Sequence, residues 1–370
     1  MAHVIEMARL LAGYCKGCGV ELLAEGDVYP RPRYHVPSSI LEMYDAVMRI
    51  DGGYDGILKY MVDYTSSPTY ETGYLSRHTK SIPLKEELRR MFAGKHALGV
   101  NVSTPREQFA QADLSLGRVG YSPWPTAGAI LATNSIPTVY GEGGICRMVI
   151  GEAARSLSPD CLTMGGILDA LSAEILCEKG IDVGLDDPVS FSDGKIAYLK
   201  APDGSETVLV CEGDARCASV SLKAGAEILL YAVVGDEKIP FAYRYENGEG
   251  AKFVVLCVDA TALPRNSGVY RGYLQQELFA SAVTWISGQE LPVFLPACPD
   301  LYTICKGDDT GTAVAFFNFF ADSVEDAVVR LDRPYRAVHF LNGEGRLAGD
   351  RLYISSIPAY SFVACSLSRD

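Results

Sequence analysis

The segment over residues 19–63 alternates a short apolar run, a helical stretch and a second apolar run. The first run ends in Glu25, the stretch over 39–49 has helical spacing, and the run over 56–63 ends in Asp63. Strand, helix and strand in this order indicate a βαβ unit with parallel strands. In a parallel (β/α) barrel the catalytic groups lie at the carboxyl ends of the strands. The sequence therefore predicts the last two strands of such a barrel, with acidic side chains at the catalytic end.

The pattern along the chain divides it into three parts. Residues 1–95 are predicted to form the partial (β/α) barrel segment. Residues 96–291 alternate strands and helices in a Rossmann-like order, with a β segment inserted at about 187–245. Residues 292–370 consist of short β runs separated by Gly, Asp and Pro, which is typical of an antiparallel β sandwich. The expected fold class is α/β, a partial barrel end followed by a Rossmann-like domain and a terminal sandwich.

Residues 83–92 have the composition of a helix. Pro83 suits the first helical position, because its missing N–H is not needed there. Lys85, Arg89 and Arg90 form the densest basic patch of the chain. We expect this patch to be a solvated helix face and not a binding site.

Charge and composition exclude several functions. The 370 residues carry a formal net charge of −13, and no basic stripe could release counterions from nucleic acid. No stretch approaches the ~20 apolar residues of a membrane span. Glu6 and Arg9 interrupt the amino-terminal apolar residues, which argues against a signal peptide. The cysteines are scattered within apolar runs, as in proteins whose thiols stay reduced. We expect a cytoplasmic protein that binds neither nucleic acid nor a membrane.

A pair of carboxylates follows the first apolar run. Glu25 and Asp27 are two residues apart, so their side chains share a face if the strand continues that far. A retaining glycosidase uses one carboxylate as nucleophile and a second as acid/base, about 5–5.5 Å apart. We predict Glu25 as the nucleophile; the residues that could orient it or hold sugar hydroxyls are Asp27, Arg31, Arg33, Tyr34 and His35. The alternative is that Glu25 and Asp27 are turn carboxylates paired with Arg31 or Arg33.

The second apolar run leads into a loop rich in Tyr and Ser. Asp63 and Tyr64 begin this loop and Glu71 lies near its end. Carboxylates and hydroxyls can bind sugar hydroxyls, and aromatic rings can stack on a sugar. We therefore predict these three residues as substrate-binding residues. The alternative is an ordinary loop after a strand.

The cysteines and glycines give no sign of a metal or a cofactor. Cys15 and Cys18 form a single CxxC pair, whereas zinc would need a second pair or two histidines at matching spacing. The pair also closes a helix, whereas a redox pair would open one. Cys146 has no histidine nearby to act as its base. The GEGG phrase at 141–144 lacks the lysine of a phosphate-binding loop. We expect packing roles for the cysteines, no metal and no cofactor.

The order of these elements resembles the carboxyl-terminal half of a β-galactosidase of glycoside hydrolase family 42. The resemblance rests on the strand with Glu25 and on the phrases GYDGILKYMVDY, ALGVNVSTP, GILDALSAEILCEKGIDVGL and PAYSFVACSL. It implies that Glu25 is the nucleophile on the seventh barrel strand. It also implies that 96–291 is a trimerisation domain with the fold of class I glutamine amidotransferases, without their catalytic residues. The part over 292–370 is similar to the family's terminal β domain.

The chain departs from the family pattern where catalysis is concerned. No segment corresponds to barrel strands one to about six, and the family's acid/base Glu lies on the fourth strand. Pro30, Arg31 and Pro32 follow Glu25, where aromatic residues and Ser are expected. The resemblance thus implies the carboxyl-terminal portion of a retaining, β-galactosidase-like glycoside hydrolase, incomplete or inactive alone, with a galactoside-like carbohydrate as its substrate or ligand.

Two alternatives remain open. The first is a non-catalytic oligomerisation or carbohydrate-binding module, and the second is an unrelated thiol enzyme that uses Cys15 and Cys18. A partial barrel would leave open strand edges and an apolar helix face formed by Val4, Met7 and Leu11. We therefore expect a homo-oligomer, for which the resemblance implies a trimer.

Overall fold

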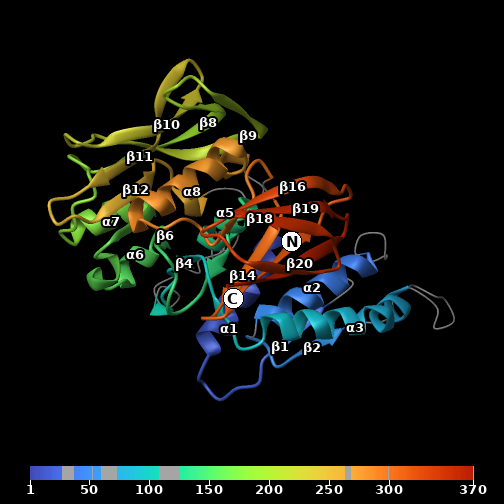
Figure 1. The fold of residues 1–370 in the computed structure, drawn as a ribbon. Coiled ribbons are helices and arrows are strands. Elements are labelled where there is room, and N and C mark those ends of the chain that lie inside the picture. The colour runs from blue at the N-terminus through green and yellow to red at the C-terminus, as the bar shows by residue number, and fades with distance from the viewer. Residues whose placement is uncertain are drawn as a thin grey trace, which may run out of the picture. The chain divides into compact units, whose positions relative to one another are not determined.

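The computed structural model describes residues 1–26, 37–51, 53–59, 73–107, 126–262, 268–298 and 300–369. The chain divides into two compact units (Figure 1). Unit 1 comprises residues 1–98, 292–295 and 300–370, and unit 2 comprises residues 99–291 and 296–299. The beginning and the end of the chain thus belong to the same unit. Together the units make a mixed α/β protein with several sheets.

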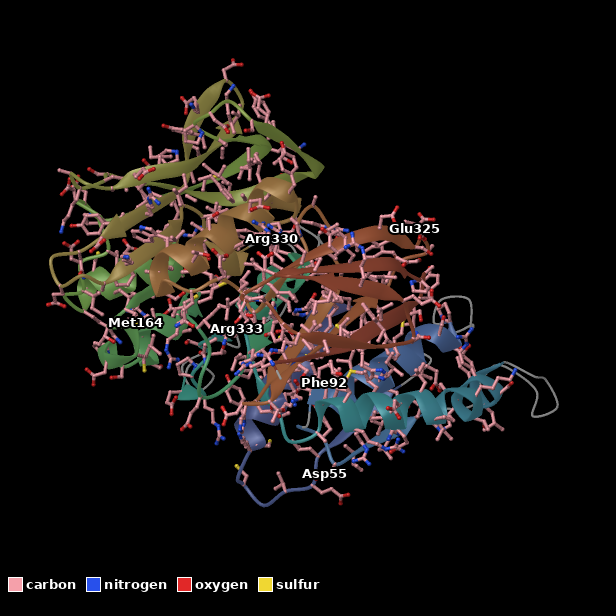
Figure 2. All side chains as sticks on the ribbon, in the orientation of Figure 1. Asp55, Phe92, Met164, Glu325, Arg330 and Arg333 are labelled. Carbon is pink, nitrogen blue, oxygen red and sulfur yellow. The ribbon has the colours of Figure 1, made fainter. Side chains whose placement is uncertain are left out.

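Unit 1 begins with the strand, helix and strand that the sequence predicts. Strands β1 (Leu23–Gly26) and β2 (Gly56–Lys59) pair in parallel, with Glu25 opposite Leu58 and Gly26 opposite Lys59. Helix α2 (Ser38–Asp51) contacts both strands. Asp55, which is labelled in Figure 2, lies at the amino-terminal ends of the strands. Its Oδ2 accepts a hydrogen bond from the Leu22 N–H at 2.8 Å.

Two further helices of unit 1 pack against α2. Helix α1 (Ala2–Cys15) and helix α3 (Tyr74–Phe92) both contact α2. The prediction that Pro83 begins a helix is wrong, because α3 starts at Tyr74 and contains Pro83 in its interior. The earlier turns are held by tertiary packing, since the Tyr74 ring is buried against Leu41.

Two antiparallel sheets complete unit 1. The first has the order β13-β16-β19-β18 and the second the order β17-β20-β15-β14-β3. Their strands are β3 (His96–Ala97), β13 (Val293–Phe294), β14 (Tyr302–Gly307), β15 (Gly311–Asn318), β16 (Val324–Leu331), β17 (Ala337–Leu341), β18 (Gly345–Ala348), β19 (Arg351–Ile357) and β20 (Ser361–Ser368). Strand β19 contacts β15 and β20, and helices α2 and α3 contact β20. The five-stranded sheet therefore has neighbours on both faces, which explains why every residue of β14 and β15 is buried.

Unit 2 is built on one nine-stranded sheet among the described residues, with the order β5-β4-β6-β7-β12-β11-β10-β8-β9. The strands from β5 to β12 in this order are parallel, and the rest are antiparallel. The parallel strands are β4 (Val100–Val102), β5 (Thr138–Val139), β6 (Arg147–Val149), β7 (Gly165–Asp169) and β12 (Lys252–Leu256). The antiparallel strands are β8 (Ser190–Lys200), β9 (Glu206–Ser219), β10 (Glu227–Val234) and β11 (Glu237–Glu246). These four lie where the sequence predicts an inserted β segment, and they extend the parallel sheet.

Helices cover the parallel part of this sheet. They are α5 (Thr126–Thr133), α6 (Ala153–Ser156), α7 (Ala170–Glu178) and α8 (Tyr273–Ser287). The core of the unit joins α7 to the sheet through Leu168, Ile175, Leu176, Phe253 and Val255. Short 3-10 turns lie at Pro159–Leu162, Ala260–Ala262 and Gly268–Tyr270. None of the described helices combines the length and the apolar character that a membrane span needs.

Candidate functional site

Glu25 is the predicted nucleophile, and the structure describes its position. The other predicted site residues fall outside the described residues, so their positions stay predictions; they are Asp27, Arg31, Arg33, Tyr34, His35, Asp63, Tyr64 and Glu71. Glu25 is exposed at the carboxyl end of β1. This is the end of the strand at which a parallel (β/α) barrel places its catalytic groups.

The two faces of the β1–β2 sheet differ in what covers them. Ala24 and Gly26 are buried toward α2, and a Cβ added to Gly26 would lie 2.8 Å from Leu41 Cδ1. Because side chains alternate along a strand, Glu25 lies on the opposite face. Burial raises the pKa of Tyr44, and the negative charge of Glu25 raises it further, so this charge acts on α2 as well.

The face that carries Glu25 is apolar, and its described side chains are exposed. Leu23 is 45% exposed and Leu58, directly opposite Glu25, is 55% exposed. Among the described strands, β1 and β2 pair only with each other. Parallel sheets are normally covered on both faces and continue over more than two strands. This face therefore has the character of an interior surface with an acidic group at its carboxyl end.

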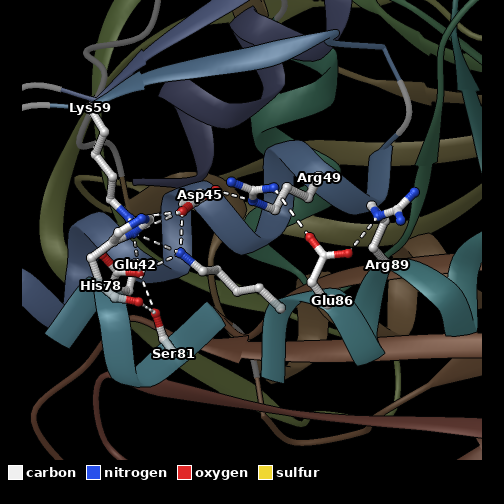
Figure 3. Close-up of polar contacts among 9 residues, drawn as sticks. Glu42, Asp45, Arg49, Lys59, His78, Ser81, Glu86 and Arg89 are labelled. Carbon is white, nitrogen blue, oxygen red and sulfur yellow. Dashed lines mark hydrogen bonds and ion pairs between the residues drawn. The ribbon is translucent and has the colours of Figure 1, made fainter. Parts of the chain in front are cut away.

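A cluster of charged side chains lies on the covered side, between β2, α2 and α3 (Figure 3). We call it the ion cluster; it consists of Glu42, Asp45, Lys59, His78 and Lys85. The Lys59 ammonium contacts Glu42 and lies 2.8 Å from Asp45 Oδ2. The Lys85 ammonium lies 2.7 Å from Glu42 Oε2 and contacts Asp45. Both carboxylates thus pair with both lysines, and these four side chains are almost completely buried.

The imidazole of His78 lies next to both ammonium groups. Its Nδ1 atom is 3.1 Å from Lys59 Nζ and 3.1 Å from Lys85 Nζ. An ammonium group can only donate hydrogen bonds, so Nδ1 must be the acceptor in both contacts. We infer that His78 is neutral and carries its proton on Nε2.

The pKa values of the cluster reflect burial and charge together. Burial is the largest single influence on Glu42 and Asp45 and favours their neutral forms. The hydrogen bonds and charges of the lysines together outweigh it, so the pKa of each carboxyl is lower than usual. Burial lowers the pKa of Lys59. Burial and then the charges of Lys85 and Lys59 lower the pKa of His78.

The ion cluster has the residue types of a metal site but not its charge balance. Possible ligand atoms of Glu42, Asp45 and His78 lie within 4.8 Å of one another. Two ammonium groups already lie among these atoms and neutralise both carboxylates. A divalent cation would have to displace both and leave them buried without partners. These residues therefore do not fit a metal ion.

Sequence reasoning missed this cluster. Arg89 and Arg90 are exposed as expected, but the prediction that Lys85 belongs to a solvated face is wrong, because Lys85 is 3% exposed and pairs with two carboxylates. A local signal exists in Glu42 and Asp45, which stand three residues apart on the apolar helix α2 and so share one side of it. Their partners come from other elements, which the sequence alone does not bring together.

The structure describes the cysteines that the sequence analysis considered. Cys146 is buried, and burial raises its pKa to about 12. Cys15 is the last residue of α1, and the thiol of Cys18 donates to the Tyr14 carbonyl at 3.7 Å.

Comparisons with known proteins identify the fold. No family model matches the sequence, and no curated protein matches it. Among solved structures, α-L-fucosidase isoenzyme 2 from Paenibacillus thiaminolyticus has a TM-score of 0.61 at 11% identity, covering 98% of this chain and 62% of the fucosidase. A β-galactosidase from Rahnella sp. R3 has a TM-score of 0.57 at 12% identity, covering 99% of this chain and 58% of that one. A β-galactosidase from Bacillus circulans sp. alkalophilus has a TM-score of 0.53 at 10% identity, covering 90% of this chain and 52% of that one.

The chain therefore spans between about half and three fifths of the length of these enzymes. Identities of this size show a common fold and do not carry over a substrate. These three neighbours are glycoside hydrolases by name, and this chain shares their fold over the matched part.

Proposed function

We propose that this chain is the carboxyl-terminal portion of a retaining, β-galactosidase-like glycoside hydrolase in which Glu25 is the nucleophile. The observation that carries the proposal is the position of Glu25, at the carboxyl end of β1 and on the exposed apolar face next to Leu58. In a (β/α) barrel this face is the interior, and the remaining strands would pack against Leu23 and Leu58. Solved β-galactosidases that share the fold support this assignment.

In the completed site the Glu25 carboxylate would attack the anomeric carbon of a galactoside-like sugar. The glycosidic bond to the leaving oxygen breaks as the new ester bond forms, and water then hydrolyses the glycosyl-enzyme. The acid/base carboxylate would come from a barrel strand outside this sequence, so we expect the chain to be incomplete or inactive alone. We propose that Asp27, Arg31, Arg33, Tyr34 and His35 bind the sugar, together with Asp63, Tyr64 and Glu71.

The rest of the chain would serve assembly. We propose that residues 1–95 form the barrel segment, 96–291 an amidotransferase-like trimerisation domain and 292–370 a terminal β domain. The parallel strands and the inserted antiparallel strands of unit 2 are consistent with such a domain. We further propose a cytoplasmic homo-oligomer.

A mechanism-based label tests the role of Glu25 without the acid/base residue. A 2-deoxy-2-fluoro-galactoside with a dinitrophenolate leaving group needs no protonation to depart, so the nucleophile alone can be glycosylated. We expect mass spectrometry to find the sugar on the peptide that contains Glu25. The Glu25→Gln variant should lose the label, whereas Glu21→Gln, an exposed carboxylate four residues earlier, should keep it. A label on another residue would rule out the nucleophile assignment.

The second candidate is a non-catalytic oligomerisation module, favoured by the exposed apolar side chains themselves. Leu23 and Leu58 on the sheet, with Val4 and Leu11 on α1, could bind a second copy instead of barrel strands. Sedimentation velocity of the Leu58→Lys variant would then show dissociation, and Leu75→Lys on exposed α3 serves as the control. Dissociation of the first variant alone, without sugar labelling, would favour this candidate. A Leu58→Lys variant that sediments like the parent would exclude it.

A further inference from the structure

We infer that neutral His78 holds the first half of α3, residues 74–82, against α2 and β2. Protonation of its imidazole would release this half of the helix. The inference concerns the fold itself and does not depend on the proposed glycosidase activity. It rests on how this half helix is attached and on which atom of His78 accepts hydrogen bonds.

Pro83 divides α3 into two halves. Proline has no N–H, so the hydrogen bond to the carbonyl of residue 79 is missing, and its ring crowds the preceding turn. His78 and Ser81 precede Pro83, whereas Lys85 follows it. The ion cluster therefore spans the weakest point of the helix and connects its two halves.

The first half of the helix has few attachments. Within residues 74–82 the described side chains are exposed or half-buried except for Tyr74, and Leu75 and Ile82 are 59% and 44% exposed. Among the described residues, the contacts of this half include the Tyr74 ring on Leu41, the Ser81 hydroxyl on Glu42 Oε2 at 2.6 Å, and His78 on the lysines. With so little buried apolar surface, local opening of this half requires little free energy.

Protonation would reverse the role of His78 Nδ1. The neutral atom accepts from two ammonium groups; once protonated it can only donate, and it would face two cations at 3.1 Å. The charged groups that face His78 are Glu42 and Asp45 from α2, Lys59 from β2 and Lys85 from α3. Both carboxylates already pair with the two lysines and lie farther away, at 3.6 and 3.9 Å from Nδ1. Protonation would therefore remove the contacts by which His78 holds this half of the helix. Because the side chain is only 21% exposed in the closed helix, the imidazolium becomes fully hydrated only when this half opens.

The sign of the pH dependence follows from this arrangement. In the closed helix the pKa of His78 is below its usual value, whereas in the opened helix it returns to an ordinary imidazole value. Opening therefore becomes more favourable as the pH falls below the ordinary value. If only the opened form bound the proton, the opening constant would rise about 30-fold between about pH 7.5 and about pH 5, from an ordinary pKa of ~6.5. Glu42 and Asp45 titrate at lower pH, so they do not contribute in this window.

Amide hydrogen exchange of the full chain measures the opening directly. We expect the protection factors of residues 74–82, corrected for intrinsic exchange, to fall by up to about 30-fold from about pH 7.5 to about pH 5. Residues 84–92 should change much less. The His78→Gln variant keeps a side-chain acceptor but cannot be protonated, so its pH dependence should vanish. His96→Gln, an exposed histidine outside the cluster, should behave as the parent does.

A second measurement does not rely on a variant that folds. Nitrogen NMR of the imidazole in the unaltered protein should show Nδ1 unprotonated at neutral pH, and His78 should titrate in step with the loss of protection. A His78 ring that carries its proton on Nδ1 would overturn the inference. Protection that depends equally on pH in the parent and in His78→Gln would overturn it as well.

Discussion

Arg9 on α1 and Asp51 at the end of α2 form a partly buried ion pair in which Arg9 Nε lies 2.7 Å from Asp51 Oδ1. Arg9 also donates to Glu6 Oε1 at 3.0 Å, and the hydroxyl of Tyr302 on β14 donates to the same oxygen at 2.5 Å. Helix α1 therefore buries its charges, while Val4 and Leu11 stay exposed. This network joins α1 and α2 to β14, which belong to the same compact unit.

Replacing Arg9 by Ala should destabilise unit 1 strongly. The change leaves the carboxylate of Glu6, which is 0% exposed, in the interior without its cationic partner. Breaking a buried ion pair from one side typically costs about 3–5 kcal/mol. Urea unfolding followed by circular dichroism would measure the loss. The control is Arg90→Ala, an exposed partner of Glu87, for which we expect at most about 0.5 kcal/mol. Equal losses of stability in Arg9→Ala and Arg90→Ala would contradict the conclusion that Arg9 neutralises a buried carboxylate.

The ion cluster should make the protein sensitive to acid. Because the folded state lowers the pKa of Asp45 and of Glu42, their contribution is present above the ordinary carboxyl range and is lost as the pH falls through the lowered values. Asp45→Asn should lower the stability at neutral pH by about 3–5 kcal/mol, since Lys59 and Lys85 lose one shared carboxylate. The variant should also lose less stability than the parent between about pH 5 and pH 3. Thermal unfolding of both proteins over this pH range would test these two statements. Plots of stability against pH that run parallel for the parent and for Asp45→Asn would contradict the second.

Local sequence patterns predicted some elements of the fold well. Helix α2 was expected over 39–49 from apolar spacing, and the PDGS phrase at 202–205 lies between β8 and β9, as its turn composition indicates. These signals depend on residues close together in the chain. Where an element is amphipathic or a turn is tight, the local pattern is sufficient.

Long-range pairing overrode other local signals. The SDGK phrase at 192–195 has the composition of a turn, but it lies within β8. It pairs with residues 214–217 of β9, opposite a second stretch with turn composition, Gly213 to Arg216. Cross-strand neighbours thus decide the conformation where each stretch alone favours a turn. The same limit applies to the ion cluster, because Lys59, His78 and Lys85 meet Asp45 only through the packing of α3 on α2.

Asp169 should titrate at an unusually high pH for an aspartate. Its side chain caps α7 and accepts hydrogen bonds from the N–H groups of Gly151, Ser172 and Ala260 at 2.8, 2.9 and 3.0 Å. Complete burial outweighs these bonds and raises the pKa of Asp169 to about 6. The folded state thus binds more protons than the unfolded state above the ordinary carboxyl range, so this carboxyl contributes less stability as the pH rises to about 6. Carbon NMR of the carboxyl group would give its titration directly.

The Asp169→Asn variant distinguishes the effect of the capping hydrogen bonds on stability from the effect of the buried negative charge. Its amide cannot accept from all three N–H groups, so the variant should be less stable than the parent. The difference should be largest near pH 4 and smaller at neutral pH, where the parent must bury a charge. A difference that grows with pH would show that the hydrogen bonds outweigh burial.

Two glycines with similar backbone angles should respond very differently to substitution. Gly165 at the start of β7 has φ +93°, and an added Cβ would lie 1.8 Å from the Lys252 carbonyl oxygen of the paired strand β12. Gly204, in the turn between β8 and β9, has φ +95° and open space around it. Both alanine variants bear the cost of a left-handed conformation, about 1–2 kcal/mol. Only Gly165→Ala must also separate two strands in the core of the sheet, so we expect a total loss of about 3–5 kcal/mol. Thermal unfolding followed by tryptophan fluorescence, to which Trp285 on α8 contributes, would compare them. Equal losses would mean that strands β7 and β12 do not approach as closely as their pairing requires.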